Sequence, residues 1–388
     1  MEILPLLLLF LGHVAVDTFQ GTLPVVLVKL KEVFQLSYFQ VGIMMMMLNL
    51  TSSVIQPIFG YISDRFHTGW FIPVGILWTA LTMGLIGWSP NYFTALLLVG
   101  FTGLGTAAFH PRAMMSVYLV SGLKLGFGAA IFSTGGNLGF AIGPLVGGVL
   151  VLGFGLHATL GLIPIGILLF LAFIFYPGDF LRRESKKSAA VSKQQDQMAA
   201  AIPWVSLIAV CLIVTIRSWV YMSAITYLPM YFETQGVELK SGSVLLTIYL
   251  ACGAAAGLYG GHLSDNVGRI SVIVVSALIY PFLGALMLMT KGPWVWVLAG
   301  ASGAALLASF SVTIVLAQEL MPRYIGLVSG LMLGLSFGTG GLGSALSGYL
   351  ADIFGLYITF WVLALVPVLI AGLAILIKAP SSTISELI

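Results

Sequence analysis

Long, nearly uninterrupted apolar runs follow one another along the whole chain, separated by short polar connections. A bilayer-spanning helix needs about 20 mostly apolar residues, because every backbone polar group must be satisfied within the segment. The runs are too long and continuous for the ten-residue alternation of a membrane β-barrel. The predicted spans are 3–28, 38–62, 70–88, 93–115, 123–152, 158–176, 204–232, 242–262, 271–290, 295–319, 326–351 and 357–377. The pattern predicts an all-α membrane protein with twelve transmembrane helices.

Composition supports a lipid environment for most of the chain. Of 388 residues, 59% are hydrophobic and only 7% are charged, whereas a soluble domain carries about 25% charged residues. The net charge of +3 leaves no basic patch for nucleic acid, so we expect no nucleic-acid partner. Cys211 and Cys252 lie inside apolar runs and are typical of small buried hydrophobes, so we expect neither a redox pair nor a metal site.

The basic residues are distributed unevenly between the two sets of connections. If both termini are cytoplasmic, eleven of the 16 Lys and Arg residues fall on the inner side, four fall on the outer side, and Arg217 lies within a span. This bias predicts a multi-pass protein of the cytoplasmic membrane with both termini inside. The first span lacks the basic start of a signal peptide, so we interpret it as a helix that is retained.

Two short patterns occur once in each half of the chain. GYISDRFHTG follows the second predicted span and GHLSDNVGR follows the eighth, so that Asp64 corresponds to Asp265. Leu-Pro pairs also end the first and seventh spans. A repeat of this length predicts a two-lobed secondary transporter with its substrate site between the lobes. The predicted domains are a six-helix lobe at 1–177, a cytoplasmic linker at 178–202 and a pseudo-symmetric six-helix lobe at 203–388.

These patterns resemble the major facilitator superfamily over essentially the whole chain. GYISDR matches the signature of its loop between the second and third helices, and GFAIGPLVGG at 139–148 matches the motif of its drug antiporters. GHVAVDTFQG, AAFHPRA, IFSTGGNLGFAIGP, RSWVY and AQELMPR are similar to the fosmidomycin-resistance subfamily. The resemblance implies the major facilitator fold and efflux of small, often anionic antibiotics driven by inward proton flow.

The chain departs from that family pattern at two positions. Drug antiporters carry an arginine one turn before the glycine of the fourth helix, and here Val99 stands four residues before Gly103. Arg112 also occupies a position at which the subfamily has an acidic residue. The resemblance therefore does not identify the substrate.

A cytoplasmic gate is predicted at the inner turns. Asp64 and Asp265 follow helices at positions where a carboxylate can accept hydrogen bonds from the start of a neighbouring helix. Arg65, Arg269 and Arg112 supply nearby positive charge. The alternative is a solvated inner loop in which each aspartate only caps a helix.

Asp17 is the first candidate for the proton-coupling site. It lies about 20 Å along the first span, and a charge at that depth normally faces a cavity or a partner. His13 precedes it by four residues and shares its helix face, while His110 lies just before Pro111 in the fourth span. Either imidazole can relay protons near neutral pH. The alternative is a static aspartate with two structural histidines.

Arg217 is the first candidate for contact with an anionic substrate. Its guanidinium stays charged and offers a planar fork that suits a carboxylate, phosphate or phosphonate. A permanent ion pair with Asp17 or Glu319 is the alternative. Tyr221 follows one turn later on the same face. The other candidate substrate contacts are Gln20, Asn49, Asn137, Gln318 and Glu319, for which ordinary interhelical hydrogen bonds are the alternative.

Glycines recur at every fourth position in the fifth predicted span. Gly135, Gly139, Gly143 and Gly147 share one face, on which another helix can approach closely, and Pro144 introduces a kink. With Gly148 they predict a hinge and a tight seam between the lobes. Gly330, Gly334 and Gly338 repeat the spacing near the C-terminus. Close static packing is the alternative.

Together these features predict a monomeric, proton-coupled exporter of a small anionic or amphiphilic compound. Its partners are the substrate, protons and the lipid bilayer. No ATP-binding loop or catalytic spacing is present in the sequence, so we expect no enzyme activity and no cofactor besides the proton gradient. An uptake symporter for an organic anion and a lipid-handling or sensor protein remain open as alternatives.

Overall fold

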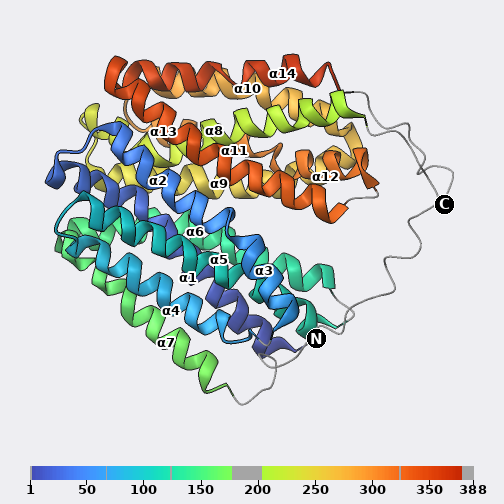
Figure 1. The fold of residues 1–388 in the computed structure, drawn as a ribbon. Coiled ribbons are helices and arrows are strands. Elements are labelled where there is room, and N and C mark those ends of the chain that lie inside the picture. The colour runs from blue at the N-terminus through green and yellow to red at the C-terminus, as the bar shows by residue number, and fades with distance from the viewer. Residues whose placement is uncertain (1, 67, 123–124, 177–202, 323–324, 378–388) are drawn as a thin grey trace. The chain divides into compact units, whose positions relative to one another are not determined.

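The computed structural model describes residues 2–66, 68–122, 125–176, 203–322 and 325–377, without the side chains of 64, 65, 125, 126, 325–327 and 329. All regular elements in these ranges are helices (Figure 1). The predicted linker at 178–202 lies outside the described residues.

The helices agree closely with the predicted spans. Those of the first half are α1 (Ile3–Phe34), α2 (Tyr38–Ser53), α3 (Gln56–Arg65), α4 (Phe71–Leu85), the 3-10 helix η1 (Ile86–Trp88), α5 (Tyr92–Ser121), α6 (Leu125–Phe154), the 3-10 helix η2 (Leu156–Gly161) and α7 (Leu162–Ile174). Those of the second half are α8 (Trp204–Thr234), α9 (Leu239–Val267), α10 (Arg269–Met289), α11 (Trp294–Leu307), α12 (Phe310–Leu320), α13 (Ile325–Leu365) and α14 (Val368–Ala374).

Eleven helical stretches of the described chain are long and apolar enough to cross a membrane. The last of them, Gly330–Ala374, has 45 residues and contains Gly355, whose φ of 80° and ψ of 159° are not helical. Two helical segments meet at this glycine, so this stretch holds two of the predicted spans. The prediction of an all-helical, multi-span membrane protein is confirmed.

Local sequence explains the sharp turn between α1 and α2. Gln35 ends α1 in the left-handed conformation, at φ 51°. Ser37 then caps α2, accepting a hydrogen bond from the Gln40 N–H while the Gln40 side chain accepts from the Ser37 N–H. This reciprocal capping box satisfies two backbone donors that the first turn of a helix leaves free. It sets the position of Tyr38 at the start of α2.

The chain forms two compact units. The first contains the described residues of 1–187 together with 224–247 and 344–356, and the second contains those of 188–223, 248–343 and 357–388. In the first unit, α1 packs along α6, and α4 packs against α5 and α7. The core of the second unit is built from apolar side chains of α8, α10, α12, α13 and α14.

Candidate functional site

Asp17 of α1 lies between two histidines in the first unit. Its Oδ2 is 3.3 Å from Nε2 of His13, one helical turn earlier, and its Oδ1 is 3.2 Å from Nε2 of His110 on α5. The two histidine Nε2 atoms are 3.1 Å apart. The structure therefore brings together all three predicted proton-coupling residues. We call them the His–Asp–His cluster.

Backbone carbonyls determine which ring nitrogens of the cluster carry hydrogen. His13 Nδ1 lies 2.7 Å from the carbonyl oxygen of Phe132, and His110 Nδ1 lies 3.1 Å from that of Thr106. A carbonyl oxygen only accepts, so each Nδ1 must donate. Both neutral rings would then point Nε2 lone pairs at each other and at Asp17. Such a group of acceptors is stable only with a cation among them.

The surroundings of the cluster are mostly apolar. The His13 ring stacks on Phe132 with ring centroids 4.0 Å apart, and Phe109 lies on another side. The side chains of His13, Asp17 and His110 are 10%, 15% and 20% exposed, so the cluster is largely but not fully shielded. Gln20 donates a hydrogen bond of 3.1 Å to Asp17 Oδ1, which adds this predicted substrate contact to the cluster.

Arg217 of α8 is buried in the second unit, with 1% of the residue exposed. Its Nη1 donates to the Ser309 carbonyl at 3.1 Å and to the Thr313 hydroxyl at 2.7 Å, where the chain passes from α11 to α12. Its guanidinium carbon lies 4.9 Å from the centre of the Phe310 ring. Nη2 is buried without a hydrogen-bond partner in the described chain.

The two acids considered as permanent partners of Arg217 are engaged elsewhere. Asp17 belongs to the His–Asp–His cluster, and Glu319 accepts hydrogen bonds from Arg269. Within the described residues, Arg217 forms no ion pair with a carboxylate. A buried charge without a counter-ion costs several kcal/mol, so this guanidinium is suited to bind an anionic ligand.

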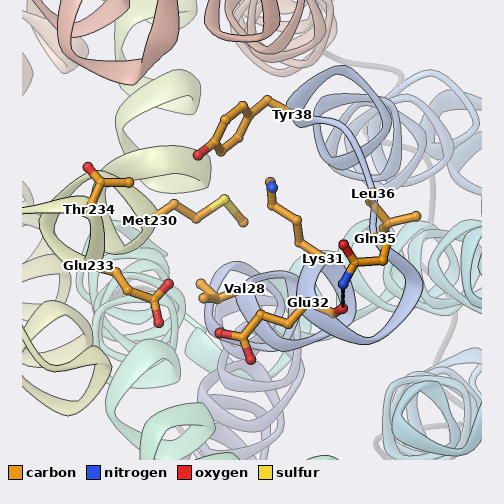
Figure 2. Close-up of a pocket in the computed structure, with 9 residues that line it drawn as sticks. All are labelled: Val28, Lys31, Glu32, Gln35, Leu36, Tyr38, Met230, Glu233 and Thr234. Carbon is orange, nitrogen blue, oxygen red and sulfur yellow. Dashed lines mark hydrogen bonds between the residues drawn. The ribbon is translucent and has the colours of Figure 1, made fainter.

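A cavity of about 270 Å³ lies where α1 ends and α2 begins, also within the first unit. Its lining consists of Val28, Lys31, Glu32, Gln35, Leu36, Tyr38, Met230, Glu233 and Thr234 (Figure 2). Lys31 Nζ lies 4.3 Å from the centre of the Tyr38 ring. Lys31 is 14 positions beyond Asp17 on α1, about 20 Å along the helix, so this cavity is separate from the cluster. None of the predicted site residues lines it.

Most of the chain matches a family of known proteins. The model of the Major Facilitator Superfamily matches residues 9–333 and 210–386. The chain belongs to the Major Facilitator Superfamily. It is therefore a multi-pass membrane protein and a secondary transporter, and it is not an enzyme.

Two relatives agree with this membership, and a solved structure has a similar fold. An uncharacterized MFS-type transporter, YfnC of Bacillus subtilis (strain 168), is 33% identical and is aligned over 94% of this chain and 90% of its own length. The fosmidomycin resistance protein of Escherichia coli (strain K12) is 28% identical over 92% and 89% of the two chains. The fold is similar to that of a bacterial homolog of the human lysosomal transporter Spinster, with a TM-score of 0.80, 18% identity and 96% of both chains covered.

The transporter carries an ionic cluster at the predicted gate of its second half. Arg269, the first residue of α10, pairs with Asp265 at the end of α9 and with Glu319 of α12 at 3.0 Å. It also donates to the Ser264 hydroxyl at 2.6 Å. The expected partnership of Asp265 and Arg269 is present. Glu319, expected beside the substrate, instead joins these residues, because its helix ends beside the start of α10.

The other predicted gate residues are less completely described. The side chains of Asp64 and Arg65 lie outside the described part of the chain. Arg112 of α5 is buried, with 3% of the residue exposed, and its Nη1 lies 2.8 Å from the sulfur of Met115. The role of Arg112 at the gate stays a prediction.

The remaining polar candidates divide between buried and exposed positions. Asn49 is buried and donates at 2.9 Å to the Met45 carbonyl of its own helix, a bond within the helix rather than the expected interhelical one. Asn137 is exposed on α6. Tyr221 and Gln318 are both partly buried, on α8 and α12 respectively.

The glycine seam lies inside the first unit, which corrects the predicted location between the lobes. A Cβ on these glycines would lie too close to residues of α1. The neighbours of Gly135, Gly139, Gly143 and Gly147 are Phe10, Val14, Gly21 and Thr22, respectively. Pro144 lies within α6 beside this face. Gly148 alone of the motif faces α9, where Ser243 is its nearest neighbour. Gly330, Gly334 and Gly338 have no described atom within 4 Å of such a Cβ, so they form no equivalent seam.

Sequence reasoning missed a carboxylate that joins α13 to α2. Asp352 Oδ1 accepts from the Tyr38 N–H at 2.8 Å, and Oδ2 accepts from the Phe39 N–H at 2.9 Å. The Tyr227 hydroxyl lies 2.9 Å from both the Tyr38 and the Ser344 carbonyl oxygens. The capping box Ser37-x-x-Gln40 is visible in the sequence and marks the start of α2. No sequence signal identifies its partner on α13.

Proposed function

We propose that this secondary transporter exports a small anionic or amphiphilic compound in exchange for protons, by alternating access of lobes formed by 1–177 and 203–388. The observation that carries the proposal is the His–Asp–His cluster. Its three acceptor groups, 3.1 to 3.3 Å apart, require a cation among them. A proton is the cation that the membrane gradient supplies, and histidine changes its charge near neutral pH. The cluster is thus suited to load and release a coupling proton.

Arg217 supports an anionic substrate. Its buried Nη2 has two hydrogens to donate and no described acceptor, and a guanidinium forms strong charge-assisted hydrogen bonds with carboxylates and phosphonates. The Escherichia coli relative is named for resistance to fosmidomycin, which favours export of a compound of that kind. The motif at 139–148 likewise favours exchange over uptake. Tyr221 and Gln318 are the accompanying polar contacts that we propose.

The remaining parts of the proposal concern the gate and the membrane. We propose that Asp265 and Arg269, with Glu319, stabilise the inner turn of the second lobe, and that Asp64 and Arg65 do the same in the first. The protein acts as a monomer in the cytoplasmic membrane with both termini inside. The bias of basic residues toward the inner connections supports this orientation.

Everted membrane vesicles test the direction and the coupling. Respiration acidifies their lumen, and fosmidomycin is then added outside as the probe. Because an exporter moves the probe into the lumen while protons leave, the lumenal pH must rise. A fall in lumenal pH would instead indicate symport. No change with fosmidomycin or a panel of phosphonates and carboxylates would contradict coupled transport and favour a binding or sensor protein.

Substitutions then test whether the cluster is responsible. Asp17→Asn keeps the size of the side chain and its ability to accept hydrogen bonds but removes the charge, so the substrate-evoked pH change must disappear. His157→Gln is the matched control, since this histidine lies in η2 outside the cluster. A full pH response in Asp17→Asn vesicles would remove Asp17 as the coupling residue.

A further inference from the structure

The His–Asp–His cluster has the donor set of a transition-metal site. It offers two imidazole nitrogens and one carboxylate, and one ligand atom from each residue lies within 4.8 Å of the other two. Imidazole and carboxylate together suit borderline divalent ions such as Zn²⁺, Co²⁺ and Ni²⁺. Ca²⁺ and Mg²⁺ are disfavoured because they require six or more oxygen ligands. We infer that His13, Asp17 and His110 form a binding site for a divalent transition-metal ion.

The separations of the ligand atoms fit such an ion. A metal that binds nitrogen at about 2.05 Å holds neighbouring ligand atoms about 3.3 Å apart in a tetrahedral site and about 2.9 Å apart in an octahedral one. The two Nε2 atoms are 3.1 Å apart, and each lies beside its own oxygen of Asp17, at 3.3 Å from His13 to Oδ2 and 3.2 Å from His110 to Oδ1. An ion among the two nitrogens and the carboxylate would therefore meet ligand atoms at nearly the separations of a tetrahedral site. The ligand set leaves at least one position for water or another ligand.

The groups around the cluster already hold the ligands in the required orientation. A metal-binding histidine normally donates its other N–H to a carbonyl or carboxylate, which fixes the tautomer. Both histidines do so, through Nδ1, toward the carbonyls of Phe132 and Thr106. Gln20 donates to Asp17 Oδ1 and restricts the carboxylate. Both Nε2 lone pairs are consequently available to a metal.

Gly136 of α6 lies against the ligand atoms, where its lack of a side chain is needed. A Cβ at this position would lie 2.8 Å from Asp17 Oδ2 and closer still to His13 Nε2. Any side chain would therefore occupy the place that an ion bound to these two atoms needs. The other glycines of the α6 seam meet backbone or apolar atoms of α1, so close helix packing alone does not account for this one.

Metal binding has a consequence for transport that rests on the proposed function. An ion held by both Nε2 atoms and Asp17 displaces the protons that the cluster would carry. Zn²⁺ should therefore inhibit substrate-evoked proton movement, competing at the site itself. The binding, in contrast, depends only on the geometry of the three side chains.

The test uses the purified full-length protein in detergent, with Co²⁺ followed by visible absorption and Zn²⁺ by calorimetry. The wild type should bind one ion and give the intense absorption of low-coordinate Co²⁺. Asp17→Asn, His110→Gln and Gly136→Ala should each weaken binding more than about tenfold, the range seen when the environment of a metal site is disturbed. His262→Gln and Gly153→Ala are matched controls that should bind as the wild type does, since Gly153 has no described atom within 4 Å of a Cβ.

Either of two results would overturn the site. One is a wild type that binds no Co²⁺ or Zn²⁺. The other is equal metal binding by the wild type and by folded Gly136→Ala. This variant retains all three ligands, so the comparison remains valid even if Asp17→Asn does not fold. Failure here is distinguishable from failure of the proposed function. Proton movement without metal binding removes only the metal site, and metal binding without proton movement removes only the coupled exporter.

Discussion

The carboxylate of Asp352 accepts hydrogen bonds from the backbone at Tyr38, 314 positions earlier in the chain. Tyr38 and Phe39 are the first residues of α2, and their N–H groups have no partner within that helix. Because the helix dipole favours negative charge at this end, Asp352 stabilises the start of α2. It also fixes the segment of α13 before Gly355 to the turn between α1 and α2.

Removal of this carboxylate should expose the start of α2. Asp352→Ala should cost about 0.5–2 kcal/mol, the usual effect of losing a helix cap, and should accelerate amide exchange at Tyr38 and Phe39. Hydrogen exchange measured by mass spectrometry on peptides covering 36–41 provides the readout. Asp352→Asn, which retains an acceptor, should show a smaller effect. Equal amide exchange rates in the wild type and in both variants would mean that other groups protect these amides.

Loss of the Tyr227 hydroxyl should weaken the same junction. Tyr227→Phe removes the donor shared by the Tyr38 and Ser344 carbonyls and should cost about 0.5–1.5 kcal/mol, visible as a lower Tm in detergent. Tyr349→Phe is the control, because that side chain is 53% exposed. If both variants have the same Tm as the wild type, the Tyr227 hydroxyl does not contribute to stability.

Arg217 should be more important for function than for stability. Burying a charge costs several kcal/mol, and Arg217 has no carboxylate partner among the described residues to offset this cost, so Arg217→Met should melt no lower than the wild type. The same variant should lose any rise in Tm that fosmidomycin produces, since ligand binding stabilises only a protein that binds. A large drop in Tm would show that the bonds to Ser309 and Thr313 are the main role of this residue.

The α1–α6 seam should tolerate no side chain at Gly143. A Cβ there would lie 2.5 Å from the Cα of Gly21, so Gly143→Ala should destabilise the protein by about 1–3 kcal/mol and impair transport. Gly153→Ala lies on the same helix in open space and should be neutral or slightly stabilising, because alanine favours helix. The Tm values of the two variants, measured in the same detergent, test this difference. Unchanged melting and transport in Gly143→Ala would contradict tight packing of this seam.

The positions of the helices could be predicted from sequence because membrane insertion depends on local hydrophobicity. The predicted span 204–232 corresponds to α8 at Trp204–Thr234, and 271–290 corresponds to α10 at Arg269–Met289. Helix spacing likewise placed His13 and Asp17 on one face of α1. Both are properties of short segments that need no knowledge of neighbouring helices.

Which helices pack together was decided only by the tertiary structure. The contact of His110 with Asp17, the pairing of Glu319 with Arg269 and the placement of the glycine seam on α1 all join residues that are distant in sequence. The sequence by itself determined the lipid environment, the helices and the few polar groups inside them, because these follow from composition and hydrophobic runs. The tertiary structure decided which of these groups satisfy one another and gave Arg217 no acidic partner among the described residues, because the partner of a buried charge depends on which helices become neighbours.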